Sequence, residues 1–230
     1  MGLFKKYFGD RYRKHCYAQC GEDLIVDYLR KRLGLKDFTY LDVGAFHPSR
    51  FSNTFLFYLK GFAGVCIEPD PRLCRAIAAK RGRDKVLNIG IGLNSEPFAD
   101  FYVMSAGTLS TFSREEAERY AGCEGKKIEQ VIKIPLLNIN EVIAKNFDGY
   151  PNFVSIDVEG LDYDIVNSFN FDKYRPEIFC VESMTYSEDR NETKVSEILE
   201  HMEKHGYLVY ADTFINTIFV DKVAWGCREV

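Results

Sequence analysis

Tyr40-Leu-Asp-Val-Gly-Ala-Phe-His-Pro-Ser-Arg-Phe-Ser-Asn-Thr54 is the stretch that decides the fold, and it has a counterpart in Gly64-Val-Cys-Ile-Glu-Pro-Asp-Pro71. The first stretch predicts a short buried strand that ends at Val43, a turn at Gly44 and a helix that begins near Ser52. The second predicts another buried strand, which ends in the carboxylate of Glu68. A strand, turn and helix of this kind place backbone N–H groups at the carboxyl edge of a parallel sheet, where open α/β sheets bind ligands.

The spacing between the two stretches indicates a nucleoside pocket. Glu68 lies 24 residues after Gly44, close to the spacing of about 20 residues at which an acidic side chain on the next strand reaches the ribose hydroxyls. A dinucleotide also needs G-x-G-x-x-G, so that bare backbone can approach the pyrophosphate, and no such glycines follow Gly44. We therefore favour S-adenosylmethionine, which has no pyrophosphate, over NAD. For Gly44 alone, an ordinary strand end and turn would be the simpler interpretation.

The bulk composition predicts a single α/β domain with additions. The 230 residues, 46% of them hydrophobic, suffice for one large core. We expect an N-terminal helical lead-in or lid over residues 1–34 and a Rossmann-like domain over 35–230, with an insertion around 98–136. The net charge of −4 gives no excess of basic residues for a phosphate backbone, so nucleic acid is not expected as a partner.

Cysteine usage and hydropathy bear on location. The seven cysteines form no C-x-x-C pair, which is typical of reduced thiols, and we expect a cytoplasmic protein. No apolar run of about 18 residues predicts a transmembrane segment, and no signal peptide is expected. The basic, aromatic segment 1–14 is interpreted either as a peripheral membrane contact or as a lid helix docked on the domain. Nothing in the sequence indicates an oligomeric state.

Strands and helices alternate along most of the chain, which predicts a mostly parallel sheet with helices on both faces. The block around 98–136 interrupts this alternation near the pocket, and its Ser/Thr/Gly loop offers Thr108, Ser110 and Thr111 as ligand contacts or is simply solvated. The last two strands, joined by a short link, predict an antiparallel hairpin at the sheet edge. The predicted strands are 40–43, 63–68, 85–91, 98–104, 131–136, 152–157, 176–182, 207–210 and 215–220, and the predicted helices are 21–33, 52–60, 71–81, 114–120, 161–169 and 191–205.

Three carboxylates are expected to meet at the same sheet edge, because Asp157 and Glu182 each end a buried strand and Glu159 follows directly after the first. With His47 from the first loop, they allow two interpretations. They hold a divalent ion such as Mg²⁺, which prefers oxygen ligands, or one of them is a general base while the others bind hydroxyls. We expect Asp157 to contact the reacting group. D-x-E is also an ordinary strand-to-helix turn, and the alternative role of His47 is capping or packing beside Pro48.

The donor pocket is assigned to residues at the ends of the first three predicted strands. Asn53 and Thr54, at a helix N-terminus, are candidates for the donor's carboxylate, and simple helix capping is their alternative role. Asp42 and Gly44 are assigned to the methionine end, Glu68 to the ribose hydroxyls, and Gly90 and Ile91 to the adenine wall. Ala45 and Pro69 complete the cofactor-binding candidates.

Taken together, these motifs make the chain resemble an FkbM-type S-adenosylmethionine-dependent methyltransferase, within the Rossmann-like class I methyltransferases. The resemblance extends from Gln19-Cys-Gly-Glu-Asp23 to the last hairpin, and it implies a mostly parallel seven-stranded sheet with a C-terminal antiparallel hairpin. It also implies O-methylation, often of a sugar hydroxyl in polysaccharide or glycoconjugate biosynthesis. Many relatives carry Asn and a second Gly after D-V-G-A, where this chain has Phe46-His47-Pro48. The stretches that carry the resemblance are Tyr40-Leu-Asp-Val-Gly-Ala, Arg50-Phe-Ser-Asn-Thr54, Ile67-Glu-Pro-Asp-Pro71, Ser155-Ile-Asp-Val-Glu-Gly160 and Pro176-Glu-Ile-Phe-Cys-Val-Glu182.

Two further functions remain as alternatives at this stage. An NAD-dependent nucleotide-sugar oxidoreductase would use the same type of fold, although the chain lacks a Tyr-x-x-x-Lys dyad of the short-chain kind. A non-catalytic Rossmann-like binding module would keep the fold without the chemistry.

Overall fold

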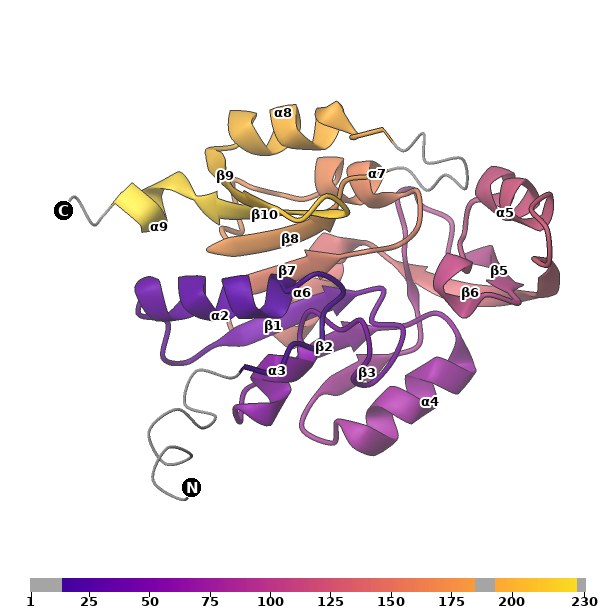
Figure 1. The fold of residues 1–230 in the computed structure, drawn as a ribbon, viewed down its shortest axis with the longest axis horizontal. Helices are drawn as coiled ribbons and strands as arrows, with labels where there is room; N and C mark the ends of the chain where they lie inside the picture. Colours follow the sequence, from indigo (N-terminus) through magenta and orange to yellow (C-terminus); the bar gives the residue numbers. More distant parts are fainter. Residues whose placement is uncertain (1–13, 185–192, 227–230) are drawn as a thin grey trace, which may run out of the picture.

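A twisted sheet of seven strands runs through the molecule, with helices on both of its faces (Figure 1). The structure is a computed structural model that describes residues 14–184 and 193–226. The basic segment 1–14, interpreted as a peripheral membrane contact or as a docked lid helix, therefore lies outside the described residues except for Lys14. In the order in which they lie side by side, the strands are β3 (Lys85–Leu87), β2 (Ala63–Ile67), β1 (Thr39–Val43), β7 (Phe153–Ile156), β8 (Ile178–Glu182), β10 (Asn216–Asp221) and β9 (Tyr207–Asp212).

The sheet is mostly parallel, as the alternation of strands and helices predicts. β3, β2, β1, β7 and β8 pair in parallel, whereas β10 runs antiparallel to β8 and forms a hairpin with β9. The predicted fold class is thus confirmed. Because the order reverses on either side of β1, the carboxyl ends of β1 and β7 border the crevice in which such sheets bind ligands.

Two apolar layers hold the helices to the sheet. Leu41, Val43 and Ile156 project to one face, where they pack against α6 (Ile139–Asn146), α7 (Asp162–Asn167) and α8 (Ser196–Lys204). Tyr40 and Phe153 project to the other face, where they pack against α2 (Glu22–Arg32) and α3 (Phe55–Leu59). α4 (Pro71–Lys80) covers the same second face through contacts with β2, and a short helix, α9 (Lys222–Gly226), follows β10. Period-two alternation along buried strands explains this division of side chains.

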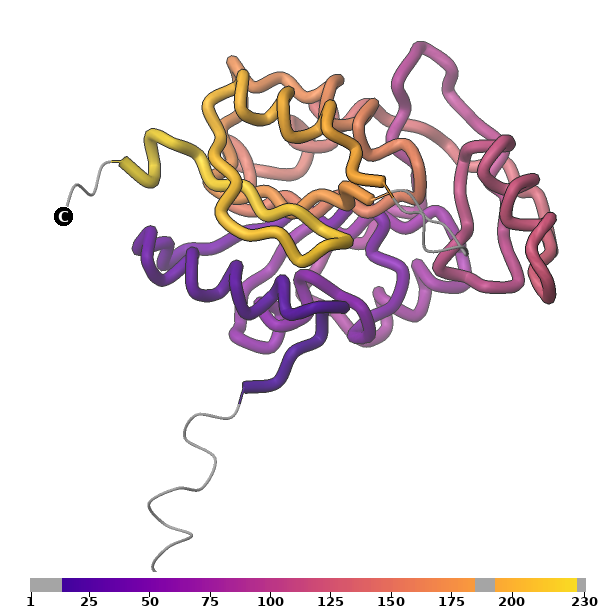
Figure 2. Tube along the Cα trace, turned by 45° about the horizontal axis from the view of Figure 1, so that its top comes forward, coloured from indigo at the N-terminus to yellow at the C-terminus, as the bar shows by residue number. Residues whose placement is uncertain are grey.

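A small second sheet occupies the region of the predicted insertion. β6 (Ile128–Leu137) lies between β4 (Gly90–Ile91) and β5 (Phe98–Met104), with a 3-10 turn, η1 (Gly107–Leu109), and α5 (Arg114–Ala121) between β5 and β6. Figures 1 and 2 place these elements together at one side of the main sheet. From here on, "the insertion" means residues 98–137.

Beyond shifts of a few residues at the ends of several elements, one strand and two helices differ from the prediction. The single strand predicted over residues 85–91 is divided between the two sheets, because the Asn88 amide donates to the carbonyl oxygens of Glu68 and Pro69 and the chain then turns to pair with β6. Helices α6 and α9 were not predicted.

Candidate active site

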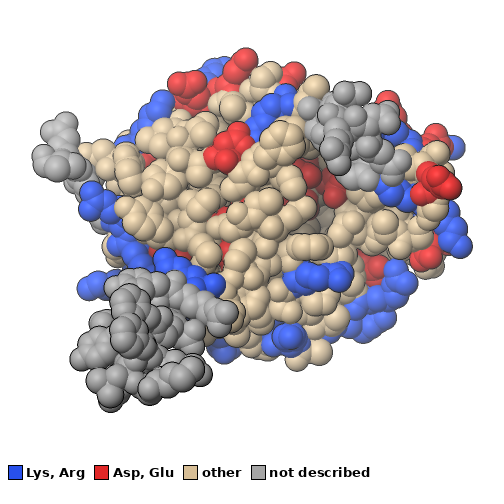
Figure 3. All heavy atoms as spheres, viewed as in Figure 1, with Lys and Arg blue, Asp and Glu red and all other residues tan. Residues whose placement is uncertain are grey.

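A cavity of about 440 Å³ opens at the carboxyl ends of β1, β2, β7 and β8. Its lining contains four carboxylates, those of Glu68, Asp157, Glu159 and Glu182, and no Lys, Arg or His among the residues that the structure describes. In Figure 3, a hollow with Asp or Glu atoms inside is visible on a face whose Lys and Arg side chains lie mostly towards the margins. The charge of this lining favours a neutral or cationic ligand over an anionic one.

Gly44 brings the first turn against the end of β7. Its φ is +83°, a conformation that glycine adopts without strain, and a Cβ placed there would lie 1.8 Å from the carbonyl oxygen of Asp157. The Gly44 N–H donates to the Ile67 carbonyl, so the turn is also tied to β2. A ligand in the cavity can therefore approach bare backbone here.

Glu68 lies at the end of β2, 4% exposed, with its side chain at the cavity. Oε2 accepts a hydrogen bond from the Phe46 N–H (2.8 Å) and Oε1 accepts one from the Asp70 N–H (2.7 Å). Burial raises the pKa of this carboxyl group to about 8, against the effect of these two donors. Each oxygen keeps a second lone pair, so the group can still accept from two hydroxyls of a ligand.

The remaining part of the lining is suited to a flat, apolar ring. Gly90 and Ile91 of β4 line the cavity, and a Cβ at Gly90 would lie 2.3 Å from the Phe112 ring. Pro69 and Leu73 complete this wall next to Glu68. Bare backbone, a buried carboxylate that can accept hydrogen bonds from hydroxyls, and an apolar slot together fit S-adenosylmethionine. Its positively charged sulfonium also suits a cavity lined by carboxylates.

Asp157, Glu159 and Glu182 form the acidic cluster. One carboxylate oxygen from each lies within 4.8 Å of the other two. Burial, followed by the charges of Asp162 and Asp42, raises the pKa of Asp157 to about 7, while a hydrogen bond with Glu182 acts in the opposite direction. Burial and neighbouring carboxylates also raise the pKa values of Glu159 and Glu182. At neutral pH the cluster therefore holds at least one proton, or it holds a cation.

Every non-glycine residue with a positive φ in the described part of the chain lines this one cavity. They are Phe46 (+49°), Phe51 (+55°), Glu159 (+58°) and Phe214 (+78°). Left-handed backbone costs such residues about 1–3 kcal/mol each, and strain of this kind concentrates at functional sites. Phe51 and Phe214 are also 48% and 64% exposed, so two aromatic side chains are partly exposed at the cavity, and the Arg50 guanidinium lies 5.4 Å from the centre of the Phe51 ring.

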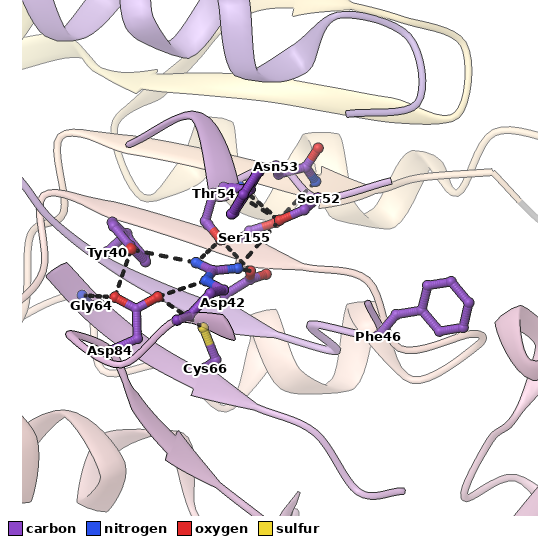
Figure 4. A network of polar contacts seen from close by, with 12 residues as sticks. Tyr40, Asp42, Phe46, Ser52, Asn53, Thr54, Gly64, Cys66, Asp84 and Ser155 are labelled. Carbon is purple, nitrogen blue, oxygen red and sulfur yellow. Dashed lines mark hydrogen bonds and ion pairs between the residues drawn. The ribbon is translucent and has the colours of Figure 1, made fainter. Parts of the chain in front are cut away.

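Behind the cavity, a buried arginine organises the polar ends of the strands (Figure 4). Arg81 is fully buried and donates to Asp84 (2.7 Å) and to the Thr54 hydroxyl (2.8 Å), and its guanidinium lies 3.8 Å from Asp42. Thr54 in turn donates to Asp42. In the same view Phe46 points away from this network.

Four of the residues predicted to bind the methyl donor lie behind the cavity rather than in its lining. Asp42, Ala45, Asn53 and Thr54 are buried and do not line the cavity, whereas Gly44, Glu68, Pro69, Gly90 and Ile91 do. The Asn53 amide donates to the Ser155 hydroxyl. Ser52 accepts from the N–H groups of Thr54 and Phe55, so the capping of α3 falls to Ser52.

His47 lies in the first loop and is not part of the cavity lining. Its Nδ1 accepts from the N–H groups of Ser49 (3.1 Å) and Arg50 (2.9 Å), which is the capping role weighed as its alternative. Burial and the charges of Arg50 and Lys80 lower its pKa. Within the described residues, the group that could hold a metal consists of the three carboxylates without His47.

Several lining residues were not expected from the sequence. Phe51 and Phe214 come from segments that look like ordinary loops, and the backbone conformations that bring them to the cavity cannot be recognised from the sequence. Gln19, which the sequence offered as a residue that could reach the pocket, also lines the cavity. Thr108 and Ser110 do line the cavity, whereas Thr111 donates instead to the carbonyl oxygen of Glu159.

Comparison with known proteins gives one family. Residues 42–209, more than half of the chain, match the family model described as "Methyltransferase FkbM domain". No match was found among curated proteins. In the described part of the chain, no helix has both the length and the apolar character needed to cross a membrane.

Three solved structures are similar to the chain at low sequence identity. A TehB-like SAM-dependent methyltransferase from Corynebacterium glutamicum is 8% identical, with 87% of each chain covered and a TM-score of 0.43. An S-adenosylmethionine-dependent methyltransferase from Clostridium acetobutylicum is 7% identical, with 89% of this chain and 92% of that chain covered and a TM-score of 0.43. The methyltransferase domain of bacterial CtHen1 is 14% identical, with 86% of this chain and 96% of that chain covered and a TM-score of 0.42.

Proposed function

We propose that this chain, which belongs to the FkbM methyltransferase family and is an S-adenosylmethionine-dependent methyltransferase, methylates a hydroxyl group of a saccharide. The observation that carries this proposal is the meeting of Asp157, Glu159 and Glu182 in a cavity whose described lining has no cationic side chain. A hydroxyl nucleophile has to lose its proton as it attacks, and this cluster offers proton acceptors for it.

The donor end of the cavity is the part around Gly44, Glu68 and Gly90. Glu68 accepts hydrogen bonds from the two ribose hydroxyls, while Pro69, Gly90 and Ile91 flank the adenine. The buried residues behind the cavity hold the turn that contains Gly44 in place; they are Asp42, Ala45, Asn53 and Thr54. When bound, S-adenosylmethionine supplies a methyl group that is already activated by its sulfonium. The protein therefore has mainly to align the acceptor and to exclude water.

Asp157 is the residue that takes the proton from the acceptor. Its raised pKa of about 7 matches the pH at which a general base works best. Glu182 shares a hydrogen bond with Asp157, and Glu159 completes the cluster, so both can also accept from the hydroxyls on neighbouring carbons of a sugar. His47 stays outside this arrangement.

A saccharide suits the rest of the cavity. Its hydroxyls contact the carboxylates, and its apolar C–H face can pack on the exposed parts of the Phe51 and Phe214 side chains. The same lining disfavours a nucleotide-sugar oxidoreductase, because the negatively charged pyrophosphate of NAD would lie among four carboxylates with no cationic side chain in the described lining. A cytoplasmic location agrees with the cysteines of the described residues, all of which are free.

A divalent ion is the second candidate for the cluster. The three carboxylates offer the oxygen donors that Mg²⁺ prefers, and an ion held by Asp157, Glu159 and Glu182 would lower the pKa of the acceptor hydroxyl.

The experiment that tests the proposal is methyl transfer to carbohydrate. The protein is incubated with methyl-labelled S-adenosylmethionine and cell-envelope carbohydrate extract, and label is expected in the sugar fraction as an alkali-stable methyl ether. Label released by mild alkali would indicate an ester instead, and label confined to protein or amines would overturn the acceptor assignment.

A further inference from the structure

Glu159 is held by residues of the insertion as well as by its own turn. The Tyr120 hydroxyl, on α5, donates to Glu159 Oε2 at 3.3 Å, and the Thr111 hydroxyl, before α5, donates to the Glu159 carbonyl oxygen at 3.0 Å. Thr111 is fully buried and Tyr120 is 1% exposed. Two solvent-excluded hydroxyls thus contact the side chain and the backbone carbonyl of one residue, and the Tyr120 hydroxyl also interacts with Glu116.

Asp162 holds the backbone on either side of Glu159 but makes no hydrogen bond to the Glu159 carbonyl or side chain. The Asp162 carboxylate accepts from the N–H groups of Val158 (3.0 Å) and Gly160 (3.2 Å), on either side of Glu159. These bonds close the turn, but none involves the carbonyl or the side chain of Glu159, which has a φ of +58°. A glutamate in the left-handed region persists only where its surroundings hold it there.

The insertion is built to remain against this turn. Tyr120 packs in an apolar cluster with Met104, Leu109 and Ala117, all from the insertion. A Cβ at Gly160 would lie 3.2 Å from the Glu116 side chain, so α5 packs closely on the turn. The small sheet and α5 therefore present a pre-arranged surface to Glu159.

We infer that Thr111 and Tyr120 are positioning residues that aim Glu159 at the acceptor side of the acidic cluster. The inference rests on the proposed function, because it gives Glu159 a place beside the reacting hydroxyl. It assigns to the insertion a part in setting the geometry of the cluster, in addition to its part in lining the cavity through Thr108 and Ser110. Asp157 and Glu182, by contrast, are placed by strands β7 and β8 of the main sheet.

The test uses three substitutions that remove or retain one hydroxyl at a time. Tyr120→Phe and Thr111→Val remove the two donors with little change in shape. Thr111→Val also removes the acceptor of the Ser113 N–H, and Thr111→Ser keeps a hydroxyl for both contacts. Tyr102→Phe is the matched control, because Tyr102 packs against the same apolar cluster while its hydroxyl makes no hydrogen bond within the described residues.

Amide hydrogen exchange supplies a readout that needs no acceptor. We expect peptides that cover residues 157–163 to exchange about three- to tenfold faster in Tyr120→Phe and Thr111→Val, because each variant loses one hydrogen bond to Glu159. Thr111→Ser and Tyr102→Phe should exchange like the wild type. Peptides that cover 63–70, and the Kd for S-adenosylhomocysteine in calorimetry, should stay within twofold in all four variants.

Methyl transfer to the envelope extract supplies the second readout. At saturating donor, the rate should fall about tenfold in Tyr120→Phe and Thr111→Val, and the hydroxyl in Thr111→Ser should restore it. Unchanged exchange in the turn would overturn the inference, and so would faster exchange with an unchanged rate. A wild-type protein that methylates no carbohydrate would refute the proposed function, and the exchange experiment would still decide whether the insertion holds Glu159.

Discussion

Replacing Glu68 with glutamine should weaken donor binding far more than it disturbs the fold. The carboxylate accepts one backbone N–H on each oxygen, from Phe46 and from Asp70, and the amide of glutamine can accept only one of them. The other N–H then faces an NH₂ group. This loss costs about 1–3 kcal/mol of unfolding free energy, offset in part because a charge is no longer buried.

Donor binding suffers from the loss of the charged acceptor. Hydrogen bonds to a charged group contribute about 1.5–3 kcal/mol, so the Kd for S-adenosylmethionine should rise about 10- to 100-fold in Glu68→Gln. Calorimetry at about pH 9 measures this directly, because Glu68 is ionised above its pKa of about 8, and a thermal melt at the same pH checks the fold. Glu96→Gln is the control, because Glu96 is exposed and lies outside the cavity lining. Donor affinity within twofold of the wild type, in a variant that melts normally, would refute the assignment of Glu68 to the ribose.

Three further outcomes are expected. Gly44→Ala should accumulate poorly in folded form because its Cβ would lie 1.8 Å from a carbonyl oxygen. Gly61→Ala, with φ of +95° and nothing within 4 Å, should show only the conformational cost of about 1–2 kcal/mol. Urea unfolding compares the two variants, and equal stability would contradict the packing argument. Burial raises the pKa of Glu68 to about 8 and that of Asp157 to about 7, so the unfolded chain releases these two protons at a lower pH than the folded chain does. The unfolding free energy should therefore fall as the pH rises from about 5 to 8. A urea midpoint that increased over this range would contradict this prediction. Methyl transfer should survive dialysis against EDTA if a carboxylate is the base, and a loss that Mg²⁺ restores would favour the cation instead.

The fold could be predicted almost completely because its signals are local and repeated. Buried strands that end at Val43, Glu68, Asp157 and Glu182 are predicted to alternate with capped helices, and this pattern leaves few topologies open. The division of residues 85–91 between two sheets could not be predicted, since it depends on the Asn88 amide and on pairing with a strand some 45 residues later along the chain. α6 was missed although Asn138 caps it in an ordinary way.

The candidate site was predictable only to the level of the strand ends. Sequence reasoning placed Asp157, Glu159 and Glu182 together, and their oxygens do lie within 4.8 Å of one another. It could not tell that Asp42 and Thr54 turn towards Arg81, because that contact joins distant parts of the chain inside the core. The positive φ values of Phe51 and Phe214 are likewise set by tertiary context rather than by residue type.

The most direct test is to compare methyl transfer and donor affinity in Asp157→Asn. If Asp157 accepts the proton of the acceptor hydroxyl, transfer to carbohydrate should fall by at least about 100-fold, while the Kd for S-adenosylmethionine stays within about threefold of the wild type. Transfer at the wild-type rate in this variant would contradict the account.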